Sequence, residues 1–356
     1  MIKNLVRGPT APVLLARMLA AVLLSGCGSS GSPGTASPDT ATPSPQDGSY
    51  PVQIDNCGRT LTFDEAPSRA VLLYHPMAEI FVGLGLADRA IGRVGYEGAL
   101  TKPPPLLPEQ AADFEQIPVV SDGNFPPPKE QMLALRPDFL FAYGDFDYGG
   151  EHEGAEGLAT LEDLDAAGVQ VYTVVCPDKA GKSTEETLEA TYRAILDIGT
   201  IFGVSERAEQ RVEQMKAQIA EVGDTVAGEP VLKVIAYGGG TGPVSLAGGS
   251  TIISQIIDAS GGENVFADRD PFFEASLEAV AAKDADAFLI FADYEEATDK
   301  LDATKESEFL FTTFPGMQAS RDRRVAVTDY VYTSPGWRVA QTVEDIARQL
   351  HPEVFE

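Results

Sequence analysis

Apolar and polar residues are arranged along this chain in short alternating runs, which predict strands and helices in turn. Between Val52 and Phe63 the two kinds alternate on either side of a turn, as in a β-hairpin. The apolar run 69–76 ends in proline and predicts a buried strand. Residues 77–92 then show the spacing of a helix with a glycine stop.

The same order of helix, turn and strand recurs at 129–143 and 158–175, so the first half predicts a largely parallel sheet. No strand pattern interrupts 183–222. There Ser183 and Glu186 predict a capping box, and a second, very polar helix starts after Gly203.

A second α/β half follows from 231 onwards, and its unit at 277–292 repeats the pattern of 129–143. The glycine-rich stretch 237–249 is interpreted as a tight loop at a ligand cleft, because it lacks the spacing of a dinucleotide site. The predicted fold class is α/β, with two Rossmann-like lobes joined by a single long helix.

The N-terminal segment has the pattern of an export signal. Three basic residues and no acid precede or flank the apolar run 18–24, which is shorter than the ~20 residues that span a bilayer. The residues 24–27 resemble the lipobox of bacterial lipoproteins, which implies cleavage before Cys27 and lipid on that cysteine. An ordinary secretory signal with an incidental cysteine is the alternative. A flexible Ser/Thr/Pro/Gly tether follows.

The expected segments therefore run in this order: 1–26 signal peptide, 27–50 lipidated cysteine and tether, 51–182 first lobe, 183–226 linking helix and following helix, 227–356 second lobe.

The chain has three cysteines, an odd number for an exported protein. Lipidation of Cys27 leaves Cys57 and Cys176, which are expected to form a disulfide in an oxidising compartment. Two separate buried thiols are the alternative.

Composition narrows the classes of function. The formal net charge of −28 disfavours binding to nucleic acid or to anionic lipid. Three histidines supply a dedicated metal cage poorly, and no Ser/His/Asp or Cys/His constellation is evident, so neither a resident metal nor an enzyme is expected. Residues 180–183 resemble the end of a phosphate-binding loop, but the first glycine of that motif is missing, so a nucleotide site is not expected there.

Motifs along nearly the whole mature chain resemble one family. They are the lipobox, APSRAVLLYHPMAEIFVGLGLADRAIG, KEQMLALRPDFLFAY, TYRAILDIGTIFGVSERAE, LEAVAAKDADAFLI and VYTSPGWRVAQTVEDIARQLHPE. In this order they resemble the class III, helical-backbone substrate-binding proteins of ABC importers for ferric siderophores, haem and cobalamin. The early NCGR and the second cysteine before the linker resemble the iron–siderophore branch.

The resemblance implies two permease-docking residues, Glu130 and Glu278, one on the outer face of each lobe. One exposed carboxylate per lobe would steer and register a basic pocket on a two-fold symmetric partner. The alternative is that each acidic side chain only stabilises the first turn of its helix by interacting with the helix dipole.

The resemblance also implies a ligand between the lobes, bound by loops at strand ends. The aromatic and polar residues expected to line this cleft are Tyr74, His75, Tyr96, Asn124, Phe125, Tyr143, Phe146, Tyr148, Tyr237, Phe273, Tyr294, Tyr332, Trp337 and Arg338, with Met77, Asp122, Phe272 and Tyr330 as further candidates. Trp337, the single tryptophan, is placed at the cleft rim, and Arg338 is expected to donate to hydroxamate or carboxylate oxygens. The bulky YHPMAE turn departs from the family and puts transfer of a relative's contacts in doubt.

The expected function is that of a monomeric, lipid-anchored receptor on the outer face of the cytoplasmic membrane. It would bind a chelated Fe(III) complex, with a hydroxamate siderophore favoured, and deliver it to the permease of an ABC importer. A cobalamin or haem receptor is the alternative within the family. A secreted hydrolase and an adhesion lipoprotein are more remote alternatives.

Overall fold

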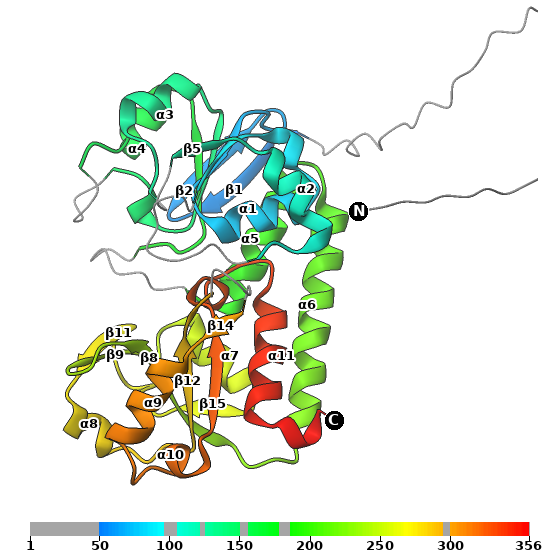
Figure 1. The fold of residues 1–356 in the computed structure, drawn as a ribbon. Coiled ribbons are helices and arrows are strands. Elements are labelled where there is room, and N and C mark those ends of the chain that lie inside the picture. Colours follow the sequence, from blue (N-terminus) through cyan, green and yellow to red (C-terminus); the bar gives the residue numbers. More distant parts are fainter. Residues whose placement is uncertain are drawn as a thin grey trace, which may run out of the picture. The chain divides into compact units, whose positions relative to one another are not determined.

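Two α/β lobes and a pair of long helices make up the described part of the chain (Figure 1). The computed structural model describes residues 50–95, 105–121, 125–149, 156–177, 186–294 and 300–355. The signal, Cys27 and almost all of the tether therefore lie outside the described residues.

The first lobe is built on a parallel five-stranded sheet in the order β5-β4-β3-β6-β7. Its strands are β3 (Ala70–Leu72), β4 (Ala90–Val94), β5 (Val119–Ser121), β6 (Phe139–Ala142) and β7 (Gln170–Thr173). Its helices are α1 (His75–Gly83), α2 (Pro108–Gln116), α3 (Lys129–Leu135) and α4 (Leu161–Ala166), with the 3-10 turns η1 (Ala87–Arg89) and η2 (Asp145–Asp147). All residues of β3 and β6 are buried, as expected for the centre of a parallel sheet.

The predicted hairpin is confirmed as β1 (Val52–Asn56) and β2 (Arg59–Phe63). The helix predicted over 77–92 is wrong in its second half. It ends at Gly83, Gly85 takes a φ of +68°, and the chain returns as strand β4. A left-handed glycine after a helix is a common stop signal, and here it comes earlier than the periodicity indicates.

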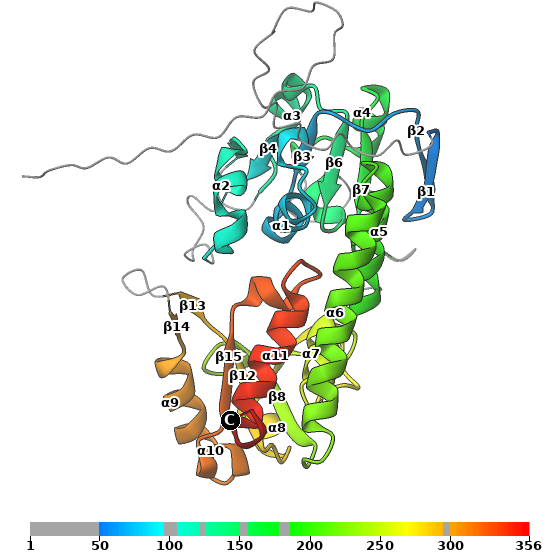
Figure 2. The same cartoon turned by 90° about the vertical axis from the view of Figure 1, so that its right-hand side faces the viewer.

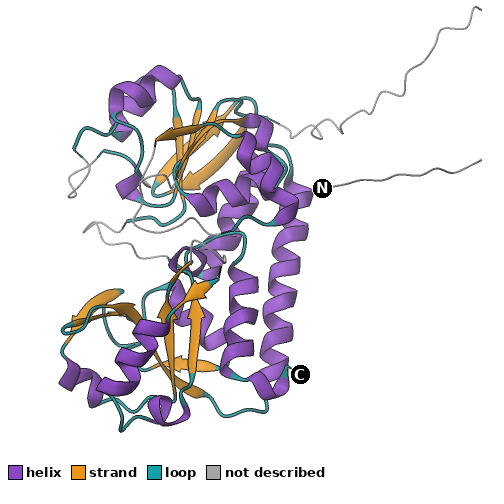
Figure 3. Ribbon diagram, viewed as in Figure 1, coloured by secondary structure: helices purple, strands orange, loops and turns teal. Residues whose placement is uncertain are grey.

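The second lobe has a mixed sheet in the order β11-β9-β8-β12-β15, with β10 also paired to β8. Its strands are β8 (Leu232–Gly239), β9 (Val244–Ala247), β10 (Gly262–Asn264), β11 (Phe272–Ala275), β12 (Ala287–Phe291) and β15 (Val325–Thr328), beside a small ribbon of β13 (Asp293–Tyr294) and β14 (Leu301–Asp302). Its helices are α7 (Ile252–Ala259), α8 (Leu277–Ala281), α9 (Thr304–Thr313), α10 (Gln318–Asp322) and α11 (Val339–Leu350), with the 3-10 turns η3 (Tyr330–Thr333) and η4 (Pro352–Val354). Figure 3 separates the strands of both sheets from the helices that cover them.

The glycine-rich stretch after β8 is a hairpin turn, where a tight cleft loop was predicted. Gly239, Gly240 and Gly242 have positive φ angles, and the chain reverses into β9, which runs antiparallel to β8. Such φ values suit glycine alone, and the reversal makes this half of the sheet antiparallel.

Two helices follow the first lobe, α5 (Leu188–Ile201) and α6 (Ser205–Val226). The second, α6, contacts both lobes, because Arg207 donates to the Leu84 carbonyl while Gln218 donates to Glu344 at 2.8 Å. Figure 2 shows α6 running along both lobes with α5 beside it. The linking helix is therefore the polar one, not the one predicted to begin at 183.

The predicted capping box also differs, because Thr187 caps α5 through its side chain and Ser183 lies outside the described residues. Gly199 of α5 lets the two helices approach closely. A Cβ atom there would lie 2.4 Å from the Cβ of Ala208.

One large apolar core passes through both lobes by way of these helices. Phe81 and Phe139 meet Phe202 edge to face, with ring centroids 5.0 and 5.3 Å apart. The same cluster of buried side chains continues through Met215 of α6 to Ile346 of α11. Since a close-packed interior resists deformation, this side of the molecule holds the lobes in a fixed relation.

Candidate functional site

Aromatic side chains from the two sheets meet where the lobes adjoin. Tyr74 and Tyr143 follow β3 and β6, and their ring centroids are 5.0 Å apart. Phe291 ends β12 and Tyr330 follows β15, and these centroids are 5.7 Å apart. Phe272 of β11 lies 6.0 Å from Tyr330. We call these five residues the junction cluster.

The junction cluster joins the lobes and still reaches solvent. Tyr74 is half-buried, desolvation of its hydroxyl raises its pKa, and it shares a hydrogen bond with Ser334 of the second lobe. Phe272 and Tyr330 each remain 43% exposed, and because their rings lie 6.0 Å apart they present adjoining aromatic surface to solvent. Because the carboxyl ends of parallel strands are the usual ligand edge of an α/β sheet, this cluster is the candidate site.

A buried carboxylate lies against the junction cluster. The hydroxyl of Tyr143 donates to Oε1 of Glu186 at 2.6 Å, and burial raises the pKa of Glu186. Two residues later, the backbone N–H of Leu188 donates to the side chain of Gln255 on α7, so this segment contacts the second lobe as well. Sequence reasoning assigned Glu186 to a helix cap and missed this position.

Asp147 fixes the loop that carries Tyr143. Its Oδ2 accepts from the backbone N–H groups of Tyr143 at 2.6 Å and Gly144 at 3.3 Å. Burial raises the pKa of Asp147 to about 7, although both hydrogen bonds act in the opposite direction. Asp147 therefore fixes the backbone from which the Tyr143 ring projects.

Arg338 forms the centre of a second contact between the lobes. Its guanidinium donates to Glu79 of α1 and to the Pro105 carbonyl, and it lies 4.6 Å from the ring centre of Tyr332. His75 lies 3.4 Å from the same carboxylate. Burial by itself would raise the pKa of Glu79, but His75 and Arg338 together hold it below its usual range.

The guanidinium of Arg338 is paired with Glu79, because a buried carboxylate requires a cationic partner. Its expected role as a donor to ligand oxygens stays a prediction.

Trp337 is also part of this second contact, and its expected place at a cleft rim stays a prediction. Its ring lies directly on Gly83, where a Cβ atom would come within 2.5 Å of it. The guanidinium of Arg211 covers the ring at 4.4 Å and donates to the Trp337 carbonyl. The tryptophan therefore joins α1, α6 and the start of α11.

Two other predicted residues lie in the cores of the lobes, and a third, Phe273, is half-buried against the core of the second lobe. Tyr148 is buried in the first lobe and accepts a 3.4 Å hydrogen bond from Thr173. Tyr237 is buried in the second lobe and donates to the Gly240 carbonyl at 2.6 Å, and Phe273 packs against Phe266. Their positions correct the expectation that they face a ligand.

The remaining predicted residues are scattered. Tyr294, Tyr332 and Arg338 line a cavity of about 640 Å³ beside α11, together with residues of the second lobe only. Phe125 is 72% exposed on the first lobe. Tyr96, Asn124 and the side chain of Phe146 lie outside the described residues.

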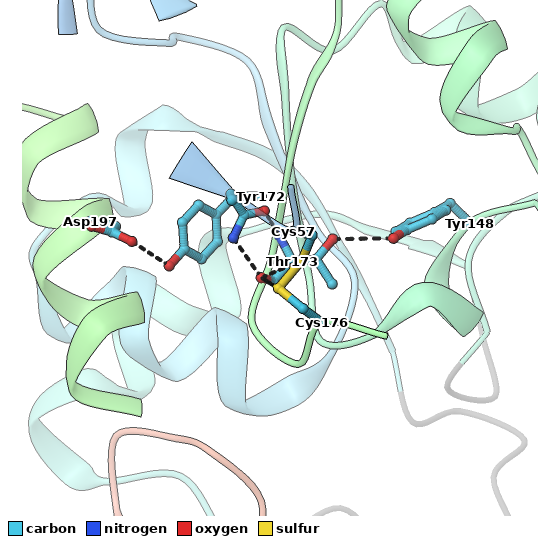
Figure 4. The surroundings of a disulfide bond; sticks show 7 residues. Cys57, Tyr148, Tyr172, Thr173, Cys176 and Asp197 are labelled. Carbon is cyan, nitrogen blue, oxygen red and sulfur yellow. Dashed lines mark hydrogen bonds between the residues drawn. A yellow bond between two sulfur atoms is a disulfide. The ribbon is translucent and has the colours of Figure 1, made fainter. Parts of the chain in front are cut away.

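The predicted disulfide between Cys57 and Cys176 is present (Figure 4). Beside it, the side-chain amide of Asn56 donates to the Thr173 carbonyl and accepts from the Thr173 N–H, both at 2.8 Å. Together these bonds attach the hairpin to β7, so the disulfide is a structural element of the first lobe.

The two expected docking residues lie in comparable places. Glu130 is exposed in the first turn of α3, and Glu278 is exposed in the first turn of α8. A hydrogen bond from its own backbone N–H and a weaker one from the Ser276 side chain lower the pKa of Glu278. Figure 1 shows α3 and α8 at opposite ends of the described fold. Docking itself stays a prediction.

Within the described ranges, no group of three or more His, Cys, Asp or Glu side chains is arranged to hold a metal ion. No helix in this part of the chain is both long and apolar enough to cross a membrane.

Comparisons with known proteins agree with this fold. The profile of the periplasmic binding protein family matches residues 71–330. An uncharacterized ABC transporter substrate-binding lipoprotein of Bacillus subtilis (strain 168), YvrC, is 22% identical over 347 residues, which covers 96% of this chain and 97% of that protein. A vitamin B12-binding protein of Yersinia pestis (strain Pestoides F) is 24% identical over 62% of this chain and 68% of its own length.

Solved structures share the architecture. A periplasmic binding protein from Veillonella parvula superposes with a TM-score of 0.70 at 21% identity, over 85% of this chain and 97% of that one. An ABC-type Fe3+-hydroxamate transport system structure from Saccharomonospora viridis gives 0.64 at 22% identity, over 84% and 99%. The resemblance seen in the sequence is confirmed for family and fold, and the chain belongs to the periplasmic binding protein family.

Proposed function

We propose that this protein is the substrate-binding component of an ABC importer and that it captures a ferric siderophore, most favourably of the hydroxamate type, at the junction cluster. The observation that carries the proposal is the grouping of Tyr74, Tyr143, Tyr330 and Phe291, which end or follow strands of the two sheets, with Phe272 at the start of β11. Aromatic surface of this kind suits a bulky ligand with a largely apolar outer face.

Charge supports the hydroxamate class. The charged groups beside the junction cluster are carboxylates, among them Glu186 and Asp147, and no described lysine or arginine pairs with Glu186. Triply charged catecholate complexes and haem propionates call for guanidinium or ammonium partners. Trihydroxamate complexes of Fe(III) are neutral or cationic, and they need none.

The relatives support the importer role and leave the ligand class open between them. One is named as an ABC transporter substrate-binding lipoprotein, one as a vitamin B12-binding protein, and one structure as a Fe3+-hydroxamate transport system. We infer that Cys27 carries a lipid anchor outside the cytoplasmic membrane, and that Glu130 and Glu278 dock a monomeric protein on its permease.

Isothermal titration calorimetry tests the proposal. The panel contains a ferric trihydroxamate, a ferric tris-catecholate, ferric citrate, haem and cobalamin, each with its metal-free form where one exists. We expect saturable binding of the ferric trihydroxamate and weak binding of the free chelator. Phe272→Ala should lower the affinity at least tenfold, since buried aromatic contacts dominate such sites. Phe355→Ala, a matched change near the C-terminal end of the second lobe, should leave it unchanged.

Binding of haem or cobalamin alone would keep the importer role and overturn the ligand class. Binding of no ferric complex, haem or cobalamin would overturn the proposed function.

A further inference from the structure

Glu186 is paired with a neutral group at a place where burial disfavours a charge. It is buried, burial raises its pKa, and its hydrogen-bond partner is the hydroxyl of Tyr143. Buried carboxylates are normally paired with a cation, as Glu79 is with Arg338 in this same protein. The unfavourable environment of Glu186 would be relieved by a positive charge delivered from outside.

The surroundings of Glu186 suit an organic cation. Tyr143 contacts the carboxylate directly, and its ring lies 5.0 Å from that of Tyr74 in a tilted arrangement. Burial, and after it the Glu186 charge, raises the pKa of Tyr330 to about 12. Tyr330 belongs to the second lobe and keeps 43% of its surface open. Aromatic faces grouped around a carboxylate attract ammonium ions through cation–π attraction and direct charge pairing.

We propose that Glu186, with the rings of Tyr74, Tyr143 and Tyr330, forms an ammonium-binding subsite, and that this protein therefore selects metal complexes carrying a primary or quaternary ammonium group. The inference rests on the proposed function for the identity of the metal complex, and it adds the charge that the ligand must carry. Glu186 is the specificity-determining residue.

A purely structural role for Glu186 makes a different prediction. If the carboxylate only orients Tyr143, then Glu186→Gln, which keeps an acceptor for that hydroxyl, changes the affinities of charged and neutral ligands equally. If the carboxylate pairs with the ligand, the same change removes the preference for the charged ligand and leaves the neutral one nearly untouched.

The decisive experiment compares two ligands with the same iron coordination. One is the ferric complex of a linear trihydroxamate with a free terminal amine, and the other is its N-acetylated form, which lacks the positive charge. The native protein should bind the amine form about tenfold more tightly, which corresponds to ~1.4 kcal/mol. In Glu186→Gln the ratio should fall below about threefold, with the affinity for the acetylated form unchanged.

Two further variants test whether the change in the affinity ratio is specific to Glu186 and its surroundings. Glu189→Gln makes the same change of charge three residues later on an exposed position of α5, and it should keep the tenfold ratio. Tyr330→Ala removes one wall of the subsite from the other lobe and should reduce the ratio without disturbing Glu186. Equal binding of the two ligands by the native protein, or an unchanged ratio in Glu186→Gln, would overturn the inference.

A second probe separates this inference from the proposed function. Butylammonium chloride, followed by ¹³C NMR of the glutamate carboxyl groups, should lower the pKa of Glu186 in the native protein, and potassium chloride at equal ionic strength should not. That result, together with failure of all ferric complexes to bind, would uphold the subsite and overturn the proposed function. An unchanged Glu186 pKa with intact binding of the ferric trihydroxamate would overturn the subsite alone.

Discussion

Two of the contacts between the lobes differ in how completely their polar and apolar groups are satisfied. At the contact of Glu79, Arg338 and Trp337, the charges are paired, the carboxylate is buried and the tryptophan ring packs against Gly83 and Arg211. At the junction cluster, Tyr330 and Phe272 remain partly exposed, and among the described residues the partner of Glu186 is the hydroxyl of Tyr143. The first contact holds the lobes together. The second leaves aromatic surface and a carboxylate that could still bind a ligand.

The largest expected effect comes from breaking the paired contact. Arg338→Met leaves the Glu79 carboxylate buried without its guanidinium, and this should lower the free energy of unfolding by about 3–5 kcal/mol in urea titrations. Replacing both residues by methionine should recover most of the loss, because the uncompensated charge is then gone.

Arg348→Met is the matched control. It removes an arginine whose partner is the partly exposed Glu344 and should cost less than about 1 kcal/mol. A loss below 1 kcal/mol for Arg338→Met would contradict the claim that this contact holds the lobes.

The next effect concerns Asp147 beneath the junction cluster. The pKa of Asp147 is about 7 in the folded protein, and 3.8, the value of an ordinary Asp side chain, is taken for the unfolded chain. The folded state therefore binds the proton more tightly than the unfolded state. The stability it contributes is full at low pH and is lost as the pH rises from about 4 to about 7. Asp147→Asn, which keeps an acceptor for Tyr143, should abolish this loss.

The measurement is the free energy of unfolding of both proteins at pH 5.5 and pH 8.5. The native protein should lose about 2 kcal/mol more than Asp147→Asn over this interval. Carboxyl groups elsewhere titrate in both proteins, so their effects on the free energy of unfolding cancel in the difference between the two. Parallel behaviour of the two proteins would contradict the burial argument.

A smaller effect is expected where Trp337 lies on α1. Gly83→Ala places a methyl group within 2.5 Å of the ring, and forcing extra volume into a packed contact should cost about 1–3 kcal/mol in thermal unfolding. Gly223→Ala in α6 meets no atom within 4 Å and should be neutral or slightly stabilising. Equal effects of the two changes would show that Trp337 is not tightly held.

The smallest effect on stability belongs to the open contact. Phe272→Ala removes a side chain that is 43% exposed, and it should change the free energy of unfolding by less than about 1 kcal/mol. A larger loss would place Phe272 among the residues that maintain the fold, and its tenfold effect on affinity could no longer be assigned to ligand contact.

Periodicity predicted the parts of the fold that depend on local pattern. The buried apolar runs became β3 and β6, and the echo between 129–143 and 277–292 became the matching units α3–β6 and α8–β12. Periodicity does not say which partner a helix packs against, so the amphipathic but polar α6 was not recognised as the linking helix.

The candidate site was predicted only in part, for a similar reason. Tyr74 and Tyr143 follow predicted strands, and they were found by that rule. Phe291 ends the strand that repeats β6, and the same rule would have found it. Arg338 pairs with a residue 259 positions away, and no local pattern in one sequence carries that information.

The disulfide has a consequence for how the protein survives damage outside the cell. Strands β3 to β7 all lie between Cys57 and Cys176, so the whole first sheet belongs to one covalent ring of the chain. A single protease cut between these cysteines opens the ring and releases no fragment unless the disulfide is reduced. The N-terminal end, with any lipid that it carries, therefore stays attached to the second lobe after such a nick.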